Sequence, residues 1–301
     1  MPSSPSAVPK KGIIRPLWSC PLLANPRGLA LARERGWLLA WDASHWVYLL
    51  NRAGQRQAQW HPPDKLAAAC AADDGSAYAA AGPRGEVWWF APDLMPRWER
   101  SLSHPAVAAA LDPFGQYLAV SDARANLYLF DCTGKRVFQV QSPRPLHHLA
   151  FVPAAPFLVG SADYGLVVCF DPAGRLVWRD GLVAHVGSLA VNGDGTQVIL
   201  ACFSEGLLCY SASGQKQGRL AFTEPCRLAA LTFDGRYLLV AGLGEELRLL
   251  DRAGQTRCTY ALDRPAVALA LGALGDTAAA ALLDGPVIGL DLREALVGGP
   301  G

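Results

Sequence analysis

The sequence of 301 residues has almost no net charge and few charged residues of either sign. Its 27 lysines and arginines face 26 aspartates and glutamates. Charged residues make up 18% of the chain, against roughly 25% in ordinary soluble proteins. Nucleic-acid-binding domains are usually clearly basic, so this balance argues against a nucleic-acid partner. Because 51% of the residues are hydrophobic, we expect a large or subdivided core.

Targeting and membrane signals are also missing. Residues 1–12 are polar and rich in proline and serine, and no apolar segment of a secretory signal follows them. We interpret them as a disordered segment and expect a cytoplasmic protein. The most apolar stretch, residues 266–282, is interrupted by Gly272, Gly275, Asp276 and Thr277, whereas a membrane-spanning helix needs about 20 apolar residues. We therefore expect no membrane partner.

Familiar catalytic and cysteine motifs are absent as well. The sequence contains neither a G-x-S-x-G nucleophile elbow nor a P-loop, and GLGEEL (242–247) lacks the third glycine of a dinucleotide-binding loop. No two of the eight cysteines form a C-x-x-C pair, so we expect reduced cysteines that fill the core. These absences predict a protein that is not an enzyme and binds no cofactor.

A period of 40 residues runs through the chain. One column of the repeat ends an apolar run in each unit and contains Asn51, Ala91, Asp131, Asp171, Ser211, Asp251 and Asp291. A turn glycine lies sixteen residues before this column in five of the seven units. A third column always carries a small residue, namely Ala30, Cys70, Ala110, Ala150, Ala190, Ala230 and Ala270. Three columns in phase over seven units indicate a repeat protein.

Each unit reads as four short strands. In the third unit, apolar or alternating segments at 107–111, 116–121, 126–130 and 135–140 are separated by turns rich in Gly, Pro, Asp or Asn. Seven such units predict an all-β fold, a seven-bladed β-propeller with four antiparallel strands per blade. The small column then belongs to the innermost strand of each blade. The column aspartates are expected to hold turns rather than to act as acids or bases.

The ends of the chain predict how the ring closes. The last unit supplies three strands and then a Gly-rich segment, 293–301, that we interpret as a flexible tail. Residues 13–20 form a lone strand in which Trp18 is in phase with Trp98, Phe138 and Trp178 of the outer strands. We expect this N-terminal strand to complete the last blade, which gives a single domain over residues 13–292 with no exposed strand edge at the seam.

Two propeller families resemble these repeats. The segments LYLFDCTGKRVF (127–138), VVCFDPAGRLVW (167–178) and LRLLDRAGQTRC (247–258) carry the resemblance, which covers residues 13–292. LFDCTG looks like the end of a WD-repeat, although its usual Trp is missing, and GRLVW (174–178) is similar to a repeat of quinoprotein (PQQ-type) propellers. The resemblance implies the propeller fold. The cofactor and calcium ligands of quinone-dependent dehydrogenases have no counterpart in this sequence.

The register predicts a functional face made by the loops between blades and the loops between second and third strands. On this face we expect a basic arc of Arg84, Arg124 and Arg144. An acidic arc follows on the fifth and sixth units, consisting of Glu205, Glu224, Glu245 and Glu246. Tyr164 and Phe203 lie between the arcs, and His104, His147 and Arg227 lie near the channel. Arginine and aromatic residues are favoured in protein interfaces, so these twelve residues form the predicted interaction surface.

Other uses of these residues remain open. His104, His147, His148 and His185 fall near the channel of consecutive blades, where imidazoles can converge on a metal, although we expect none. A propeller that binds a small ligand or a carbohydrate would use aromatic residues between blades, for which Trp60, Trp98 and Trp178 are candidates. A lyase or hydrolase at the channel mouth would use His104, His147 or Arg227.

The sequence favours a non-enzymatic scaffold for protein–protein interaction over these alternatives. Regular blades without a long inserted loop leave little room for a catalytic constellation, whereas a ring face suffices for docking one or more proteins. We expect a monomer. Only five of the 27 basic residues are lysines, which indicates a GC-rich and bacterial gene.

Overall fold

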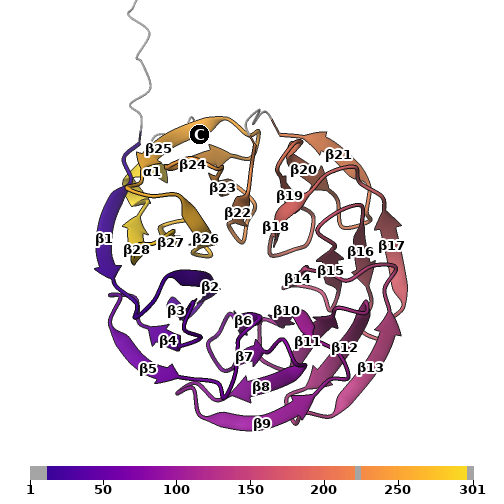
Figure 1. Ribbon diagram of the computed structural model, residues 1–301. Coiled ribbons are helices and arrows are strands. Elements are labelled where there is room, and N and C mark those ends of the chain that lie inside the picture. Colours follow the sequence, from indigo (N-terminus) through magenta and orange to yellow (C-terminus); the bar gives the residue numbers. More distant parts are fainter. Residues whose placement is uncertain (1–11, 221–224, 297–301) are drawn as a thin grey trace, which may run out of the picture.

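The computed structural model describes residues 12–220 and 225–296, and in these ranges the chain forms a ring of seven four-stranded antiparallel sheets (Figure 1). Blade one contains β2 (Pro26–Ala32), β3 (Trp37–Asp42), β4 (Val47–Leu50) and β5 (Arg56–Trp60). Blade two contains β6 (Ala68–Ala71), β7 (Tyr78–Ala81), β8 (Glu86–Phe90) and β9 (Pro96–Ser101). Blade three contains β10 (Ala106–Leu111), β11 (Tyr117–Asp122), β12 (Asn126–Asp131) and β13 (Arg136–Gln141).

The remaining blades repeat this order. Blade four contains β14 (His148–Phe151), β15 (Leu158–Ser161), β16 (Val167–Phe170) and β17 (Leu176–Asp180). Blade five contains β18 (Val186–Val191), β19 (Val198–Cys202), β20 (Gly206–Tyr210) and β21 (Lys216–Arg219). Blade six contains β22 (Leu228–Leu231), β23 (Tyr237–Ala241), β24 (Glu246–Asp251) and β25 (Thr256–Ala261). Blade seven contains β26 (Ala266–Leu271), β27 (Thr277–Leu282), β28 (Val287–Asp291) and the N-terminal β1 (Arg15–Cys20). The predicted propeller is confirmed.

The first strand of every blade lines the centre of the ring, and the last strand lies on its circumference (Figure 1). All seven residues of the small column face a central channel, a cavity of about 270 Å³ with mainly aliphatic walls. The apolar segment 266–282 becomes β26 and β27, a hairpin of blade seven. Six of its alanines are buried, which explains a hydrophobicity that resembles a membrane span.

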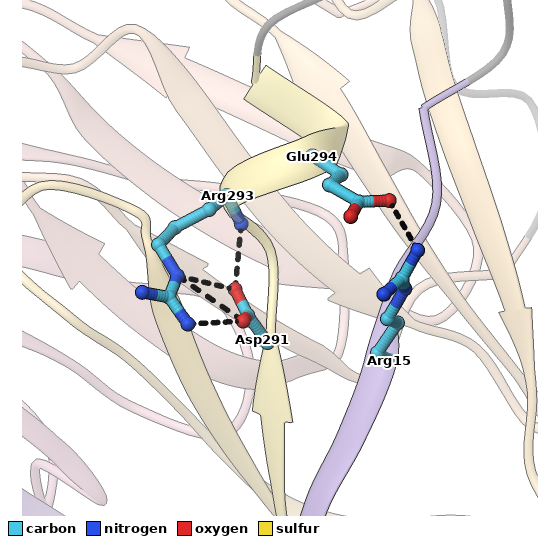
Figure 2. A network of polar contacts seen from close by, with 4 residues as sticks. All are labelled: Arg15, Asp291, Arg293 and Glu294. Carbon is cyan, nitrogen blue, oxygen red and sulfur yellow. Dashed lines mark hydrogen bonds and ion pairs between the residues drawn. The ribbon is translucent and has the colours of Figure 1, made fainter.

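The N-terminal strand closes the ring as expected. β1 pairs antiparallel with β28, with Trp18 opposite Gly289 and Cys20 opposite Val287. Figure 2 shows a second tie at this seam, where Arg15 Nη2 lies 2.9 Å from Glu294 Oε2. Glu294 belongs to a short helix, α1 (Arg293–Leu296), within the segment that we assigned to the tail. Residues 293–296 fold because Leu292 and Ala295 are buried against blade seven.

Residues 1–11 and 297–301, which include most of the expected disordered segment and the end of the expected tail, lie outside the described residues.

Tryptophans of three outer strands join blades seven, two and four to the blade that follows each of them. The Trp18 Nε1 donates a hydrogen bond of 2.9 Å to the carbonyl oxygen of Arg52, and Trp98 and Trp178 donate in the same way to Cys132 (3.0 Å) and Ala212 (2.9 Å). Each indole covers a turn glycine of the next blade, such as Gly54 with a φ of +73°. A Cβ at Gly54 would overlap the indole and strain the backbone, so the turn requires glycine for two reasons.

The column aspartates hold these same turns, as predicted. Asp131 Oδ1 accepts hydrogen bonds from the backbone N–H groups of Thr133 (2.9 Å) and Lys135 (3.0 Å). Hydrogen bonds from the Thr133 side chain and from both backbone groups lower the pKa of Asp131. Asp291 has the same role before α1, where hydrogen bonds from the Arg293 side chain and backbone lower its pKa to about 2 (Figure 2).

Antiparallel pairing gives the ring two distinct faces. We call the connection face the one that carries the loops between blades and the loops from second to third strands, such as residues 142–147 and 123–125. The turn face carries the turns from first to second and from third to outer strands, such as residues 112–116 and 132–135.

Candidate functional site

The predicted interaction surface lies on loops of the connection face, and three of its charged residues, Arg84, Glu205 and Glu246, are locally paired. Arg84 Nε lies 2.8 Å from both Asp64 Oδ2 and Glu86 Oε1, and these neighbours raise the pKa of its guanidinium. Arg124 and Arg144 are exposed, and neither forms an ion pair within the described ranges. The basic arc therefore presents two unpaired guanidinium groups from neighbouring loops.

The acidic residues follow a similar pattern. Glu205 forms an ion pair with Arg219 of the same blade, and Glu246 Oε1 lies 3.3 Å from Arg248 Nε. Glu245 is exposed, and Glu224 lies outside the described residues. Local pairing reduces the charge contrast between the two arcs, so the arcs differ less in charge than the sequence columns imply.

Aromatic residues of blades four and five form a patch around His185, between the arcs. The Tyr164 and His185 rings have centroids 4.8 Å apart, and the two residues also form a β-bridge. The backbone N–H of Phe203 donates to the His185 carbonyl oxygen at 3.0 Å. His185, in the loop between the two blades, therefore contacts both the Tyr164 ring and the Phe203 backbone on the connection face.

Further apolar side chains extend this patch, and the sequence analysis did not select them. Val183, in the loop between blades four and five, is 83% exposed. Leu243 and Leu283 are 60% and 45% exposed and occupy the same loop position as Phe203 in blades six and seven. The repeat could have indicated Leu243 and Leu283, because this column carries a large apolar residue only in blades five to seven. The other four blades have Ala43, Pro83, Ala123 and Asp163 there.

The histidines near the channel lie beside buried or exposed carboxylates. His104 Nδ1 lies 3.4 Å from Oδ2 of the fully buried Asp122, although the pair lacks hydrogen-bond geometry. His147 Nδ1 and His148 Nε2 lie 3.5 and 3.9 Å from Asp163 Oδ1. Burial lowers the pKa of His148, although its Nε2 contacts the Val186 carbonyl oxygen.

These histidines do not assemble with other ligands. In the part of the chain that the structure describes, no group of three or more His, Cys, Asp or Glu side chains could hold a metal ion. Arg227, the other candidate near the channel, is half-buried at the start of blade six.

The tryptophans considered for ligand binding have structural contacts. Trp60 packs edge-on against Trp88 and Phe90, with centroid distances of 5.2 and 4.6 Å. Trp98 and Trp178 donate to the next blade as described above. Their ring nitrogens are thus already used in contacts between blades.

Among residues 12–220 and 225–296, no helix has the length and apolar character needed to cross a membrane.

Comparisons with known proteins extend to only part of the ring. No family model matches the chain. A segment of 112 residues is 33% identical to TBC1 domain family member 31 of Bos taurus. The match covers 36% of this chain, which spans about a tenth of the length of that curated protein.

Proposed function

We propose that the protein is a non-enzymatic scaffold that docks a partner protein on the connection face of blades four to seven. One observation supports this proposal above all, which is the set of exposed apolar side chains on connection-face loops of four neighbouring blades: Tyr164, Val183, Phe203, Leu243 and Leu283. Scattered exposed apolar residues are normal on a protein surface. A run over four neighbouring blades on one face is instead typical of an interaction site.

The surroundings of this run have the composition of a docking surface. Interfaces combine an apolar centre rich in aromatic residues with a polar rim in which arginine is enriched. Here Arg124 and Arg144 lie beyond Tyr164 on one side, and Glu245 follows Leu243 on the other. The exposed guanidinium groups would select the orientation of the partner, while the apolar side chains would supply most of the buried area.

Affinity capture from the native host, followed by quantitative mass spectrometry, tests this function. The double variant Phe203→Asp/Leu243→Asp places charge in the apolar run, and Leu274→Asp is its matched control because Leu274 is 77% exposed on the turn face. We expect the double variant to lose partners that the wild type and the control retain. Identical partner sets for all three proteins would contradict the proposed surface, and a wild type without specific partners would contradict the scaffold role.

A further inference from the structure

Two exposed arginines of the connection face, Arg124 and Arg144, have no partner for their charge. In the part of the chain that the structure describes, neither guanidinium group forms an ion pair or a hydrogen bond. The Gln141 Nε2 donates a hydrogen bond of 2.7 Å to the Arg124 carbonyl oxygen. Gln141 ends β13, and Arg144 follows it by three residues. The two arginines therefore lie on adjoining loops.

The repeat explains why the arginine of blade three is unpaired. Arg84 occupies the same column in blade two, where its Nε lies 2.8 Å from both Asp64 Oδ2 and Glu86 Oε1. In the next blade, the positions of these two carboxylates carry His104 and Asn126. The same loop position thus holds a neutralised arginine in blade two and a free one in blade three.

The guanidinium of Arg144 lies at the edge of the aromatic patch. Its Cζ atom lies 3.5 Å from the position that a Cβ of Gly165 would occupy. Gly165 follows Tyr164, whose ring centroid lies 4.8 Å from that of His185. The His185 carbonyl oxygen accepts a hydrogen bond of 3.0 Å from the backbone N–H of Phe203. A short series of contacts therefore leads from a free positive charge to two exposed aromatic side chains.

The three loops at this edge carry more positive than negative charge. Residues 123–125, 142–147 and 162–166 contain two arginines and one acidic residue, Asp163. The Asp163 Oδ1 lies 3.5 Å from His147 Nδ1, and within the described residues Asp163 forms no ion pair with an arginine. A negatively charged group of a partner would therefore find complementary charge here.

A peptide with carboxylate side chains matches this edge better than other anions do. The guanidinium group is a planar fork that binds a carboxylate through two parallel hydrogen bonds. Aromatic rings beside it supply apolar contact area for a neighbouring side chain of the same peptide. A nucleic acid fits less well, because its affinity depends on many phosphate contacts and this edge offers two guanidinium groups.

We propose that the edge formed by Arg124, Arg144, Tyr164 and Phe203 binds an acidic peptide segment of the partner protein. Aspartate or glutamate side chains of that segment lie on the two guanidinium groups, and a large apolar side chain packs on the two aromatic residues. This inference rests on the proposed docking surface and adds the chemistry of the segment that docks there.

Peptide selection tests the proposal without a known partner. The probe is a phage library of random peptides of about eight residues, which span at most about 29 Å when extended. The arginine variant is Arg124→Gln/Arg144→Gln, and the control variant is Arg84→Gln/Arg264→Gln. The control removes two arginines of the same two repeat columns from other blades, so both variants lose the same net charge. Peptides selected on the wild type are synthesised with a fluorescent label, and fluorescence polarisation measures their affinity for each full-length protein.

We expect the selected peptides to be enriched in aspartate or glutamate together with a large apolar residue. Their affinity for the arginine variant should be about tenfold lower than for the wild type, because two charge-assisted contacts are lost. The control variant should differ from the wild type by less than about twofold. Raising the NaCl concentration from about 0.05 M to about 0.5 M should weaken binding to the wild type more than binding to the arginine variant. Circular dichroism verifies that each variant is folded.

Three results would overturn the proposal: selected peptides without acidic enrichment, absence of saturable binding to the wild type, or equal affinity for the arginine and control variants. Phe203→Asp/Leu243→Asp separates this failure from failure of the docking surface. If that variant loses the peptides while the arginine variant keeps them, the apolar surface stands and the acidic chemistry is wrong. If neither variant loses them, both proposals are wrong. Sedimentation velocity tests a second copy as the occupant, since a wild-type dimer that dissociates only in the arginine variant would also overturn the proposal.

Discussion

The seam between β1 and β28 gives the sharpest test of how the ring is held closed. β1 has only non-covalent contacts with β28, whereas each other outer strand follows its neighbour through a short turn. Trp18 is the main anchor of β1, because its indole covers Gly54 of blade one and Gly289 of β28. We consider two variants, Trp18→Phe and Trp18→Ala, with Trp98→Phe and Trp98→Ala as matched controls in the same repeat column.

The structure sets the expected magnitudes. Trp18→Phe removes the 2.9 Å hydrogen bond to the Arg52 carbonyl oxygen but keeps a ring over the glycines, as Phe138 does in blade three. The loss should be about 1 kcal/mol in the free energy of unfolding. Trp18→Ala also removes the ring, and because Trp18 is only half-buried the loss should be about 3 kcal/mol, at the low end for large aromatic residues. The melting temperatures should fall by about 2–3 °C and 6–9 °C.

Urea unfolding followed by circular dichroism measures these losses, and hydrogen exchange locates them. Both alanine variants should lose similar free energy, but only Trp18→Ala should accelerate exchange in β1 and β28 relative to the rest of the ring. The reason is that β9 remains joined to β8 through its turn when Trp98 is removed. A melting temperature within about 1 °C of the wild type for Trp18→Ala would refute the reasoning, as would unchanged exchange in β1.

Two further predictions concern buried groups. Maleimide at neutral pH should label the native protein quickly at the exposed Cys132 and should label the other seven cysteines only after unfolding. The reason is that these seven are buried, and burial raises the pKa of thiols such as Cys70 to about 12. Intact-mass spectrometry counts the labels on the native and the unfolded protein. Asp122→Asn and Asp112→Asn should have different effects in urea unfolding at pH 7, with a loss of about 2 kcal/mol for Asp122→Asn and a change within about 0.5 kcal/mol for Asp112→Asn. Burial opposes ionisation of Asp122, but hydrogen bonds from Asn126, Arg124 and Tyr128 outweigh it and lower its pKa, so its contribution is present above about pH 4 and is lost as the pH falls through that lowered pKa. Burial raises the pKa of Asp112 despite its backbone hydrogen bonds, so ionisation of Asp112 costs stability as the pH rises. In blade five the same column already carries an asparagine, Asn192, which shows that the fold accepts an amide there. Equal losses for the two variants would contradict this assignment.

Much of the fold could be predicted because the repeat constrains every blade in the same way. The small column had to be small where seven strands meet at the channel, and the turn glycines had to adopt positive φ beneath a ring or an adjacent chain. Strand limits in blade three differ from the expected ones by at most one residue. The alanine-rich segments became strands, since contacts between blades outweigh the helical preference of alanine.

The candidate surface was less accessible to sequence reasoning, because exposure and pairing depend on neighbours outside the column. Arg84 looked like a free charge, yet Asp64 from another loop and Glu86 two residues later both contact it. Val183 lies in a loop whose sequence shows no apolar periodicity. Nothing in the pattern therefore indicates that it is more exposed than Tyr164, Phe203, Leu243 and Leu283. A cavity of about 440 Å³ between blades three and four is lined by side chains of both blades, so no single column of the repeat reveals it.

Departures from the repeat consequently carry more functional information than the repeat itself. All seven blades meet similar packing demands, so a column that accepts small or charged residues in most blades has no folding reason to carry large apolar residues in neighbouring ones. Phe203, Leu243 and Leu283 depart together on the connection face. Phe114 and Ala154 depart on the turn face from a column that is acidic at Glu34, Asp74, Asp194 and Asp234. Replacing such residues with those of sister blades should therefore change binding while leaving folding nearly intact. In this ring, the equivalent positions of the other blades provide the control variants needed to separate the two effects.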